Sequence, residues 1–353
     1  MMTEQRLQDI LAGFGRARVL VVGDFFLDKY LVMDAALTEE SIETGLDAYQ
    51  VVEKRIAPGA AGNVCANLAA LGAGHIQALG IIGQDGEGFE LRNCLHALGV
   101  DTESLLPMLD CQTPTYTKPM LRTQGVEREL HRLDMKNHAP ISAKAEAMLL
   151  TQLRRTVPQV DAVVVGDQVQ LRNSGVVTDV VREELCRLAQ RHPHVFFLAD
   201  SRERIDEFRQ MWIKPNRHEA LRACGQSAQA MLAIPELVAA GRALAARNGR
   251  PVFMTLAEDG ILSIHDQISL VPTLPQAGPI DICGAGDSTM ASLVLALCSG
   301  ARPDEAAMLG NIVASITVQQ IGVTGKASQA QVLARFRAAG AQFQPRCLEL
   351  IPS

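Results

Sequence analysis

Short apolar runs that alternate with segments of helical composition constrain the fold of this chain more than any other feature of its sequence. The first run, residues 18–23, ends in a glycine, as buried parallel strands do where they enter a functional loop. Similar runs follow at residues 161–166, 195–199 and 251–255. Helical composition fills the segments between them, for example 143–155 and 176–190. The alternation predicts right-handed βαβ crossovers and an α/β fold, a mostly parallel central sheet flanked by helices, with ligands at the carboxyl ends of the strands.

The balance of charges argues against a nucleic-acid or membrane partner. The chain has 353 residues, of which 33 are basic and 39 acidic, so its net charge is −6. A mildly acidic chain without clusters of basic and aromatic residues is a poor match for nucleic acid or a membrane surface. No apolar run reaches the roughly 18 residues of a membrane span, and the eight cysteines form no Cys-x-x-Cys pair. We therefore expect a cytoplasmic protein with reduced thiols and a local site for any phosphate that it binds.

Two segments, residues 31–56 and 105–133, interrupt the alternation of predicted strands and helices. The second in particular consists of short extended pieces with little helical periodicity. Together they predict a small β-sheet lid over the strand ends of a single domain that spans residues 1–353. The alternative is two long surface loops, which are uncommon in compact domains. Because exposed strand edges tend to pair, the lid also predicts a homodimer.

The string Asp-Ile-Cys-Gly-Ala-Gly-Asp that ends at Asp287 precedes an apolar helix expected over residues 289–298. Backbone amides of Gly284, Ala285 and Gly286 can approach an anion at the start of that helix, where the helix dipole adds partial positive charge. Asp287 follows this turn directly, so its carboxylate can face whatever the amides hold, although it can also cap the helix. In phosphoryl transfer this arrangement supplies donors for the migrating phosphate and a base for the attacking hydroxyl.

Two further motifs place polar groups where a polyhydroxylated ligand could bind. Gly59 and Asn63 belong to a glycine-rich turn that opens a helix, so backbone and amide groups there can hydrogen-bond sugar hydroxyls. Asp24 and Asp28 follow the first predicted strand at its carboxyl end. Each of these aspartates could instead cap a helix.

With these motifs in this order, the sequence resembles the ribokinase-like, or PfkB, carbohydrate kinase superfamily through nearly its whole length. The family signatures are matched by Gly59-Ala-Ala-Gly-Asn63, by Asp281-Ile-Cys-Gly-Ala-Gly-Asp287 and, for the Asn-x-x-Glu motif, by Asn216-Arg-His-Glu219. Within the superfamily the sequence resembles the D-glycero-β-D-manno-heptose-7-phosphate kinase domain of the ADP-heptose pathway. The strings that carry this likeness are Gly23-Asp-Phe-Phe-Leu-Asp-Lys-Tyr30, Ser41-Ile-Glu43, Thr113-Pro-Thr-Tyr-Thr-Lys118, Arg132-Leu-Asp134 and the segment from Asp200-Ser-Arg202 that leads to Lys214-Pro-Asn216.

The resemblance implies an ATP-dependent kinase that phosphorylates a sugar or sugar phosphate, with a heptose 7-phosphate as the first candidate. By analogy, Asp287 is the base that deprotonates the acceptor hydroxyl, and the amides of residues 284–286 hold the transferring phosphoryl group. Asn216 and Glu219 would organise Mg²⁺ and its waters around the nucleotide phosphates, and a monovalent cation is a further candidate cofactor. The other matching positions are the sugar-binding Asp24, Asp28, Gly59 and Asn63, and the nucleotide-binding Asn216, Thr255, Glu258, Gly260 and Asn311.

Two positions depart from the family pattern. Ile282 stands where threonine or a small residue is usual, and Ala60 stands where a second adjacent glycine is usual. The His-x-Gly-His motif of the nucleotidyltransferase domain in bifunctional relatives is also absent, which predicts a kinase alone or a homologue that acts on another sugar. The alternatives are a PfkB kinase for fructose, a ketodeoxy sugar acid or a nucleoside, and a non-catalytic homologue that binds a sugar or nucleotide.

Lys118 and Arg132 lie in the predicted lid. A phosphorylated acceptor needs such cations, because its phosphate carries nearly two charges. Basic residues in a lid can also serve only to keep exposed strands soluble. Both interpretations stay open for these two side chains.

Overall fold

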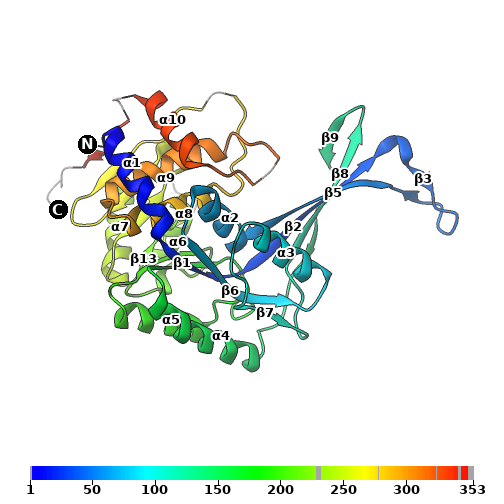
Figure 1. Cartoon of the computed structure of the whole chain (residues 1–353), viewed down its shortest axis with the longest axis horizontal. Coiled ribbons are helices and arrows are strands. Elements are labelled where there is room, and N and C mark those ends of the chain that lie inside the picture. The colour runs from blue at the N-terminus through cyan, green and yellow to red at the C-terminus, as the bar shows by residue number, and fades with distance from the viewer. Residues whose placement is uncertain (1, 228–231, 277, 323, 341–342, 349–353) are drawn as a thin grey trace.

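A ten-stranded sheet forms the centre of the molecule (Figure 1). The computed structural model describes residues 2–227, 232–276, 278–322, 324–340 and 343–348. Both ends of the predicted 1–353 domain therefore lie outside the described residues, and the domain boundary stays a prediction.

The central sheet is parallel from β7 to β14 and antiparallel from β14 to β17. Its strand order is β17-β16-β15-β14-β13-β12-β11-β1-β6-β7. The strands are β1 (Arg18–Gly23), β6 (His75–Gly83), β7 (Leu105–Met108), β11 (Ala162–Asp167), β12 (Phe196–Ser201), β13 (Trp212–Ile213), β14 (Val252–Thr255), β15 (Ile261–Ile264), β16 (Ser269–Val271) and β17 (Arg346–Cys347). The four apolar runs predicted as strands are β1, β11, β12 and β14, so the predicted α/β fold is confirmed.

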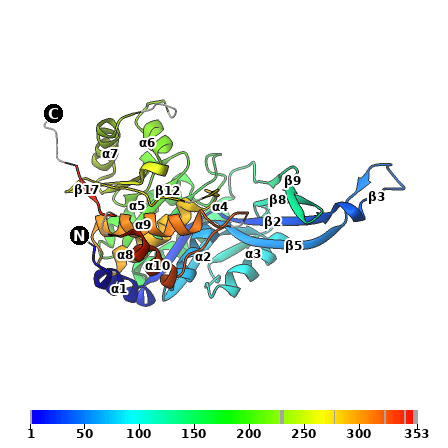
Figure 2. The same ribbon diagram turned by 90° about the horizontal axis from the view of Figure 1, so that it is seen from above.

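Helices cover both faces of the sheet (Figures 1 and 2). One face carries α1 (Glu4–Gly13), α2 (Ala61–Leu71), α3 (Gly86–Ala97), α8 (Ala285–Cys298), α9 (Pro303–Thr317) and α10 (Gln329–Ala339). The other carries α4 (Ala143–Thr156), α5 (Asp179–Arg191), α6 (Arg217–Ala223) and α7 (Ile234–Asn248). Short 3₁₀ helices are η1 (Phe14–Arg16), η2 (Ala35–Leu37), η3 (Val157–Gln159), η4 (Ile205–Glu207) and η5 (Ala257–Asp259). Among the described residues, no helix combines the length and the apolar character that crossing a membrane requires.

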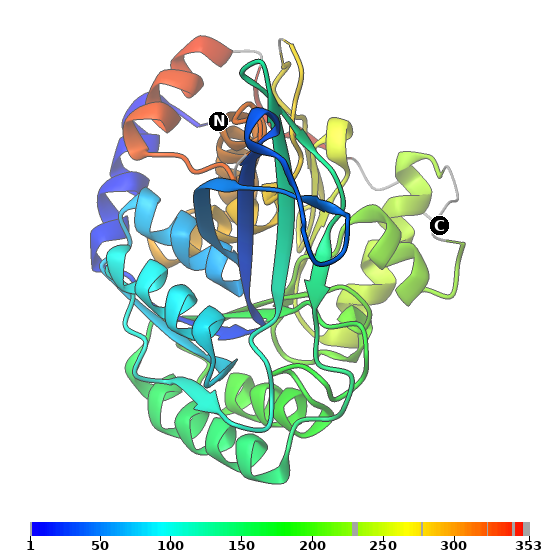
Figure 3. The same cartoon turned by 90° about the vertical axis from the view of Figure 1, so that its right-hand side faces the viewer.

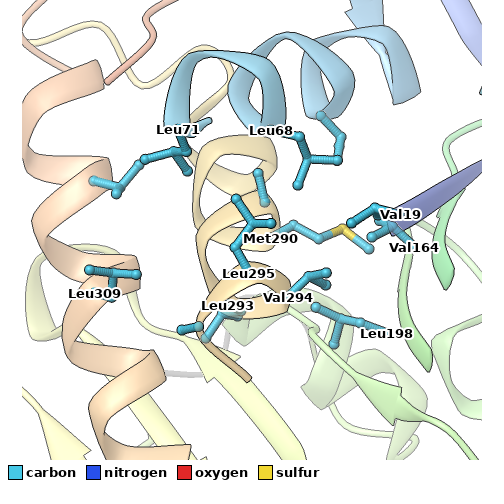
Figure 4. Packing of buried hydrophobic residues seen from close by; sticks show 14 of the residues in the cluster. Val19, Leu68, Leu71, Val164, Leu198, Met290, Leu293, Val294, Leu295 and Leu309 are labelled. Atoms are coloured by element: carbon cyan, nitrogen blue, oxygen red, sulfur yellow. The ribbon is translucent and has the colours of Figure 1, made fainter. Parts of the chain in front are cut away.

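Alternate residues of β1 divide the core into two layers. Val19 and Val21 pack in the layer that contains α2 and α8, whereas Leu20 and Val22 pack in the layer that contains α4 and α5. The division arises because successive side chains of a strand point to opposite faces of the sheet. Figure 4 shows the first layer, in which Met290 of α8 lies between α2 and the sheet. Burial on both faces explains why the central strands are continuous apolar runs.

A second sheet projects away from the body of the molecule (Figures 1 and 2) and lies in front of the body when its far end faces the viewer (Figure 3). Its order is β10-β8-β2-β5, with β9 paired to β8, and β3 and β4 form a separate hairpin at its far end (Figure 2). The strands are β2 (Phe25–Asp34), β3 (Glu39–Glu40), β4 (Asp47–Ala48), β5 (Val51–Ala60), β8 (Thr115–Thr123), β9 (Val126–Glu129) and β10 (Leu133–Met135). We call this sheet, with the β3–β4 hairpin, the lid.

The bounds of the lid differ from those predicted. The lid begins at Phe25 rather than at residue 31, because Asp24 alone separates β1 from β2. The residues Leu105–Met108, predicted as lid, form β7 at the edge of the central sheet, parallel to β6. Leu105 is fully buried there, so this short apolar stretch belongs to the core. The alternative of two long surface loops is wrong.

Ala60, at the junction of β5 and α2, generates a prediction about stability. Its φ is 51° and its ψ is −122°, a conformation that costs a non-glycine residue on the order of 1–3 kcal/mol. We expect Ala60→Gly to raise the free energy of unfolding, because the relief of strain exceeds the roughly 0.5–1 kcal/mol entropic cost of a glycine. Urea unfolding followed by circular dichroism measures the change.

Ala69 within α2 provides the matched control. A glycine there should lower the free energy of unfolding by about 0.5–1 kcal/mol, since the alanine already has a helical backbone. Equal losses of stability in both variants would show that Ala60 is not strained.

Candidate active site

The apolar pattern of the sequence predicts that the helix starts at residue 289. In the structure, helix α8 begins earlier, at Ala285. The earlier start arises because Gly284 takes a left-handed conformation, with φ of 78°, and caps the helix. A side chain at Gly284 would not fit, since its Cβ would lie 2.6 Å from Nδ2 of Asn63. The glycine turn thus lets the helix start approach α2 closely.

Not all three amides predicted to hold an anion are available. The N–H of Ala285 donates to the carbonyl oxygen of Ile282 at 3.2 Å. Among the described residues, no acceptor contacts the N–H of Gly284 or Gly286, and the first turn of a helix has no internal acceptors for its N–H groups. The positive end of the helix dipole lies here as well. An anion at this point would be held by residues on either side of Ala285.

The carboxylate of Asp287 lies in the first turn of α8. Its Oδ2 accepts a hydrogen bond from Nδ2 of Asn63 at 2.7 Å. Nδ2 of Asn67, one turn further along α2, donates to Oδ1 of Asn63 at 3.1 Å and so orients that amide toward Asp287. Burial raises the pKa of Asp287 to about 6, against the opposing effect of the Asn63 hydrogen bond. A carboxylate with this pKa is suited to accept a proton near neutral pH.

A buried ammonium group lies beside the same helix start. Nζ of Lys214 forms an ion pair with Oδ2 of Asp200 at 3.0 Å, and it lies 3.7 Å from the position that a Cβ of Gly286 would take. Asp200 is in β12, and Lys214 directly follows β13, so both lie at the carboxyl edge of the parallel sheet. Sequence reasoning missed both as site residues. The signal that could have found Asp200 is an acid directly after the apolar run 195–199.

Three carboxylates influence Lys214. Burial opposes the charge of this lysine, but Asp200, Glu219 and Asp287 outweigh it and raise its pKa. Burial and the nearby charge of Asp200 raise the pKa of Glu219 to about 7. One ammonium among three carboxyl groups leaves a negative excess, which favours a further cation at this edge of the sheet.

Asn216 and Glu219 form a capping box at the start of α6. Oδ1 of Asn216 accepts from the N–H of Glu219 at 2.9 Å, and Oε2 of Glu219 accepts from the N–H of Asn216 at 2.7 Å. In the described part of the chain, no cluster of three or more His, Cys, Asp or Glu side chains can hold a metal ion. Mg²⁺ bound with nucleotide phosphates takes only one or two carboxylates and several waters. The single carboxylate of Glu219, in a site with excess negative charge, fits that need.

Thr255 lies next to Asn216, as the predicted nucleotide site requires. The two residues pair in an isolated parallel bridge, and the N–H of Thr255 donates to the carbonyl oxygen of Pro215 at 3.0 Å. Glu258 follows in η5 and is exposed. The structure therefore brings Thr255 to the Mg²⁺ candidates, while Glu258 stays at the surface.

Gly260 and Asn311 meet at the end of β16. Gly260 has φ of 101°, and a Cβ there would clash with the carbonyl oxygen of Val271. The same oxygen accepts from Nδ2 of Asn311 at 2.8 Å. These predicted nucleotide-binding residues therefore shape the segment that follows β16, and Asn311 is buried while it does so.

Both carboxylate oxygens of Asp24 accept hydrogen bonds from the protein backbone. The side chain is buried, and its oxygens accept hydrogen bonds from the N–H groups of Gln168, Val169 and Val176 at 2.8, 3.0 and 2.8 Å. Burial raises the pKa of Asp24 to about 6. These hydrogen bonds hold the loop of residues 168–176 after β11 in place. A direct contact between Asp24 and a sugar stays a prediction.

Asp28 and Lys118 face each other on adjacent strands of the lid. Nζ of Lys118 lies 3.6 Å from Oδ1 of Asp28 and donates to the hydroxyl of Tyr30 at 3.0 Å. Gly59 on the neighbouring strand leaves space for this pair, because its Cβ would lie 2.7 Å from Oδ2 of Asp28. Lys118 also acts electrostatically on Cys283, just before α8. The structure thus brings the lid residues Asp28, Gly59 and Lys118 toward the start of α8.

Arg132 lies in the lid but is paired there. Its guanidinium donates to both oxygens of Asp134, at 2.6 and 2.8 Å, and lies 4.5 Å from the ring centroid of Tyr116. Lys136 contacts the same carboxylate at 3.1 Å. A substrate phosphate would have to compete with Asp134 for this arginine.

A cavity of about 330 Å³ lies between the lid and the carboxyl edge of the central sheet. The lid contributes Phe26 and Tyr116, whose rings meet edge to face at 5.4 Å. The loop 168–176, which Asp24 fastens, forms another wall, and Arg202 extends from the end of β12. The volume and the mixed apolar and polar lining suit a small ligand.

Comparison with known proteins gives one family model and many relatives. The model described as "pfkB family carbohydrate kinase" matches residues 18–330. The bifunctional protein HldE of Desulfatibacillum aliphaticivorans is 29% identical over 326 residues, which are 92% of this chain and 64% of that protein. HldE of Mesorhizobium japonicum is 31% identical over 340 residues, 95% of this chain and 65% of that protein. The chain therefore spans less than two thirds of the length of these curated relatives.

Solved structures share the fold. The Arabidopsis thaliana ribokinase complexed with ribose and ATP has a TM-score of 0.67 and 17% identity, with 91% of this chain and 99% of that chain covered. The phosphofructokinase-2 of Escherichia coli in complex with potassium has a TM-score of 0.67 and 16% identity, with 92% and 99% covered. At these identities the likeness concerns the fold.

The pKa of Asp287 predicts how its removal affects stability. Because the pKa of about 6 in the folded state lies above the ordinary value of 3.8, the folded protein keeps a proton that the unfolded chain releases. Stability should therefore fall as the pH rises from about 4 to 6 and stay reduced above it. We expect Asp287→Asn, which has no charge to bury, to raise Tm at pH 8 and to change it little at pH 4, as measured by scanning calorimetry.

The exposed Asp266 supplies the control, since Asp266→Asn should leave Tm unchanged at both pH values. A shift of the same size at pH 4 and pH 8 for Asp287→Asn would contradict the buried charge.

Proposed function

Because this chain belongs to the pfkB family of carbohydrate kinases, we propose that it transfers the γ-phosphoryl group of ATP to a hydroxyl of a sugar or sugar phosphate. The first candidate acceptor is D-glycero-β-D-manno-heptose 7-phosphate, which rests on the likeness of the sequence to kinase domains for that sugar. The observation that carries the proposal is the position of Asp287: buried, hydrogen-bonded to Asn63, and next to the amides at the start of α8.

In the proposed reaction, Asp287 accepts the proton of the acceptor hydroxyl as its oxygen attacks the γ-phosphorus. A new oxygen–phosphorus bond forms, the bond between the γ-phosphorus and the bridging oxygen of ATP breaks, and ADP leaves. The amides around Gly286 and the ammonium of Lys214 face the charge that spreads over the phosphoryl oxygens. Asn63 holds the carboxylate in place through its hydrogen bond.

Glu219 and Asn216 would hold Mg²⁺ through its waters, and that ion would supply positive charge to the nucleotide phosphates. Thr255, Gly260 and Asn311 line the expected nucleotide side. A monovalent cation stays a candidate, supported by the potassium in the E. coli phosphofructokinase-2 structure.

Other acceptors remain alternatives: fructose, a ketodeoxy sugar acid and a nucleoside each fit the same transfer chemistry, and a non-catalytic binding protein would keep the fold without turnover. The buried Asp287 favours catalysis over binding alone. A buried carboxyl group with a raised pKa lowers the stability of the fold, and a site that only binds neutral sugars does not need such a group.

A cytoplasmic location stays a prediction.

The proposal predicts that Asp287→Asn lowers turnover by about 10²–10⁴ while ATP binding persists, because an amide cannot accept the hydroxyl proton. In the wild type, activity should rise with pH through about 6, as Asp287 ionises. ADP release with a panel of sugars and sugar phosphates measures turnover, and calorimetry measures ATP binding. Asp266→Asn should match the wild type. Near-normal turnover of Asp287→Asn would remove this residue from the role of base.

The lid also predicts a homodimer, because it carries exposed apolar side chains on its edge strands β5 and β9 and in the turn between β3 and β4. These are Ile42, Leu46, Val51, Val52 and Val126. Light scattering at micromolar concentration should give about twice the chain mass of 38.1 kDa. Val52→Asp should shift the mass toward the monomer, whereas Phe89→Asp on α3, also exposed, should not. A wild-type monomer that is fully active would contradict the dimer.

A further inference from the structure

One cation on the wall of the 330 Å³ cavity has no partner among the residues that the structure describes. Arg202 lies just after β12, and its backbone N–H donates to the carbonyl oxygen of Asp167 at 3.0 Å. Within the described ranges, its guanidinium makes no hydrogen bond, ion pair or contact over an aromatic ring, and the residue is exposed. Most other arginines at this edge are engaged; Arg204, two residues later, is buried against Asp167 at 3.0 Å.

The two lid cations predicted from the sequence are less available. Lys118 is held by Asp28 and the hydroxyl of Tyr30, and Arg132 is held by both oxygens of Asp134. An anion that used either side chain would have to break these contacts. An anion that bound to Arg202 would break no such contact. The free energy of its hydrogen bonds to the guanidinium would therefore contribute more fully to the binding affinity.

A second cation on the cavity wall is paired. Lys136 lines the cavity, but its Nζ contacts Oδ2 of Asp134 at 3.1 Å. The acidic side chain on the wall, Asp24, has its oxygens occupied by three backbone N–H groups. The wall also carries the amide side chains of Asn137, Gln168 and Gln170, which can hydrogen-bond hydroxyl groups. Arg202 is therefore the wall group that would distinguish an anionic ligand from a neutral one.

Arg202 also relates the cavity to the reaction site. Its charge acts on Asp287 and favours the ionised carboxylate. Asp287 does not itself line the cavity, so Arg202 is a wall residue whose charge reaches the proposed base. A planar guanidinium donates two parallel hydrogen bonds to a phosphate or carboxylate, which a neutral hydroxyl cannot match.

We propose that this cavity binds an acceptor sugar that carries an anionic group, and that Arg202 is the side chain that selects it. This inference rests on the proposed kinase function and narrows it to acidic sugars. Phosphate and carboxylate share the chemistry that Arg202 recognises, so the sugar phosphate and the sugar acid are separated by experiment.

The test compares Arg202→Gln and Arg202→Lys with the wild type. The acceptors are heptose 7-phosphate, fructose 6-phosphate and 2-keto-3-deoxygluconate, with heptose and fructose as neutral partners. We expect Arg202→Gln to raise KM for the preferred acidic sugar at least about tenfold, with KM for the neutral sugars changed little. Arg202→Lys should recover part of the loss, since it restores the charge but not the two parallel donors. Arg16→Gln is the matched control, because Arg16 precedes β1 at the opposite edge of the sheet.

Calorimetric titration of the same sugars without nucleotide separates this inference from the proposed function. A loss of acidic-sugar affinity in Arg202→Gln supports the inference even where no acceptor yields ADP, a result that would refute the kinase proposal alone. The inference is overturned by any of three results: the wild type binds no acidic sugar, it binds neutral sugars equally well, or Arg202→Gln binds the acidic sugar as the wild type does. Parallel titrations of Lys118→Ala and Arg132→Ala identify the cation responsible in the last case.

Discussion

The electrostatics of the site depend on the buried ammonium of Lys214. It pairs with Asp200 at 3.0 Å, and Glu219 and Asp287 also act on it. Without this charge, three carboxyl groups would share a desolvated region with only hydrogen bonds to offset them, which is costly in a medium of low polarity. With it, Asp287 keeps a pKa of about 6 and remains able to ionise near neutral pH. The same arrangement leaves a negative excess that a divalent cation with nucleotide phosphates can offset.

The topology brings these groups together. In a parallel sheet, every strand ends at the same edge, so residues from β12, β13 and the turn before α8 converge although they are far apart in the chain. Gly284 completes the arrangement, because its left-handed backbone and missing side chain let α8 start against Asn63 of α2. The apolar residues of α8 then anchor that start in the core (Figure 4).

The lid and the cavity beneath it determine what the site can accept. β2 leaves β1 after a single residue, so the lid is tied directly to the edge where chemistry would occur. Asp24, that single residue, holds the loop 168–176 through three backbone N–H groups and so shapes the opposite wall. In the proposed function, walls of this kind would accommodate many small sugars, and the charge of Arg202 is the feature that we propose to distinguish among them.

The sequence by itself determined the α/β class, the central strands β1, β11, β12 and β14, and the glycine turn before Asp287, because apolar periodicity and glycine placement are local properties. It misplaced β7 and the start of α8, since short strands and helix starts are decided by what packs against them. The role of Lys214 was decided by tertiary structure: the string Lys214-Pro-Asn216 contributes to the family resemblance, but only the burial of this lysine beside Asp200 makes it part of the site. Likewise, the sequence does not distinguish the basic residues Lys118, Arg132 and Arg202. Folding pairs Lys118 with Asp28 and Arg132 with Asp134, but gives Arg202 no partner within the described part of the chain, because pairing depends on distances that no linear pattern encodes.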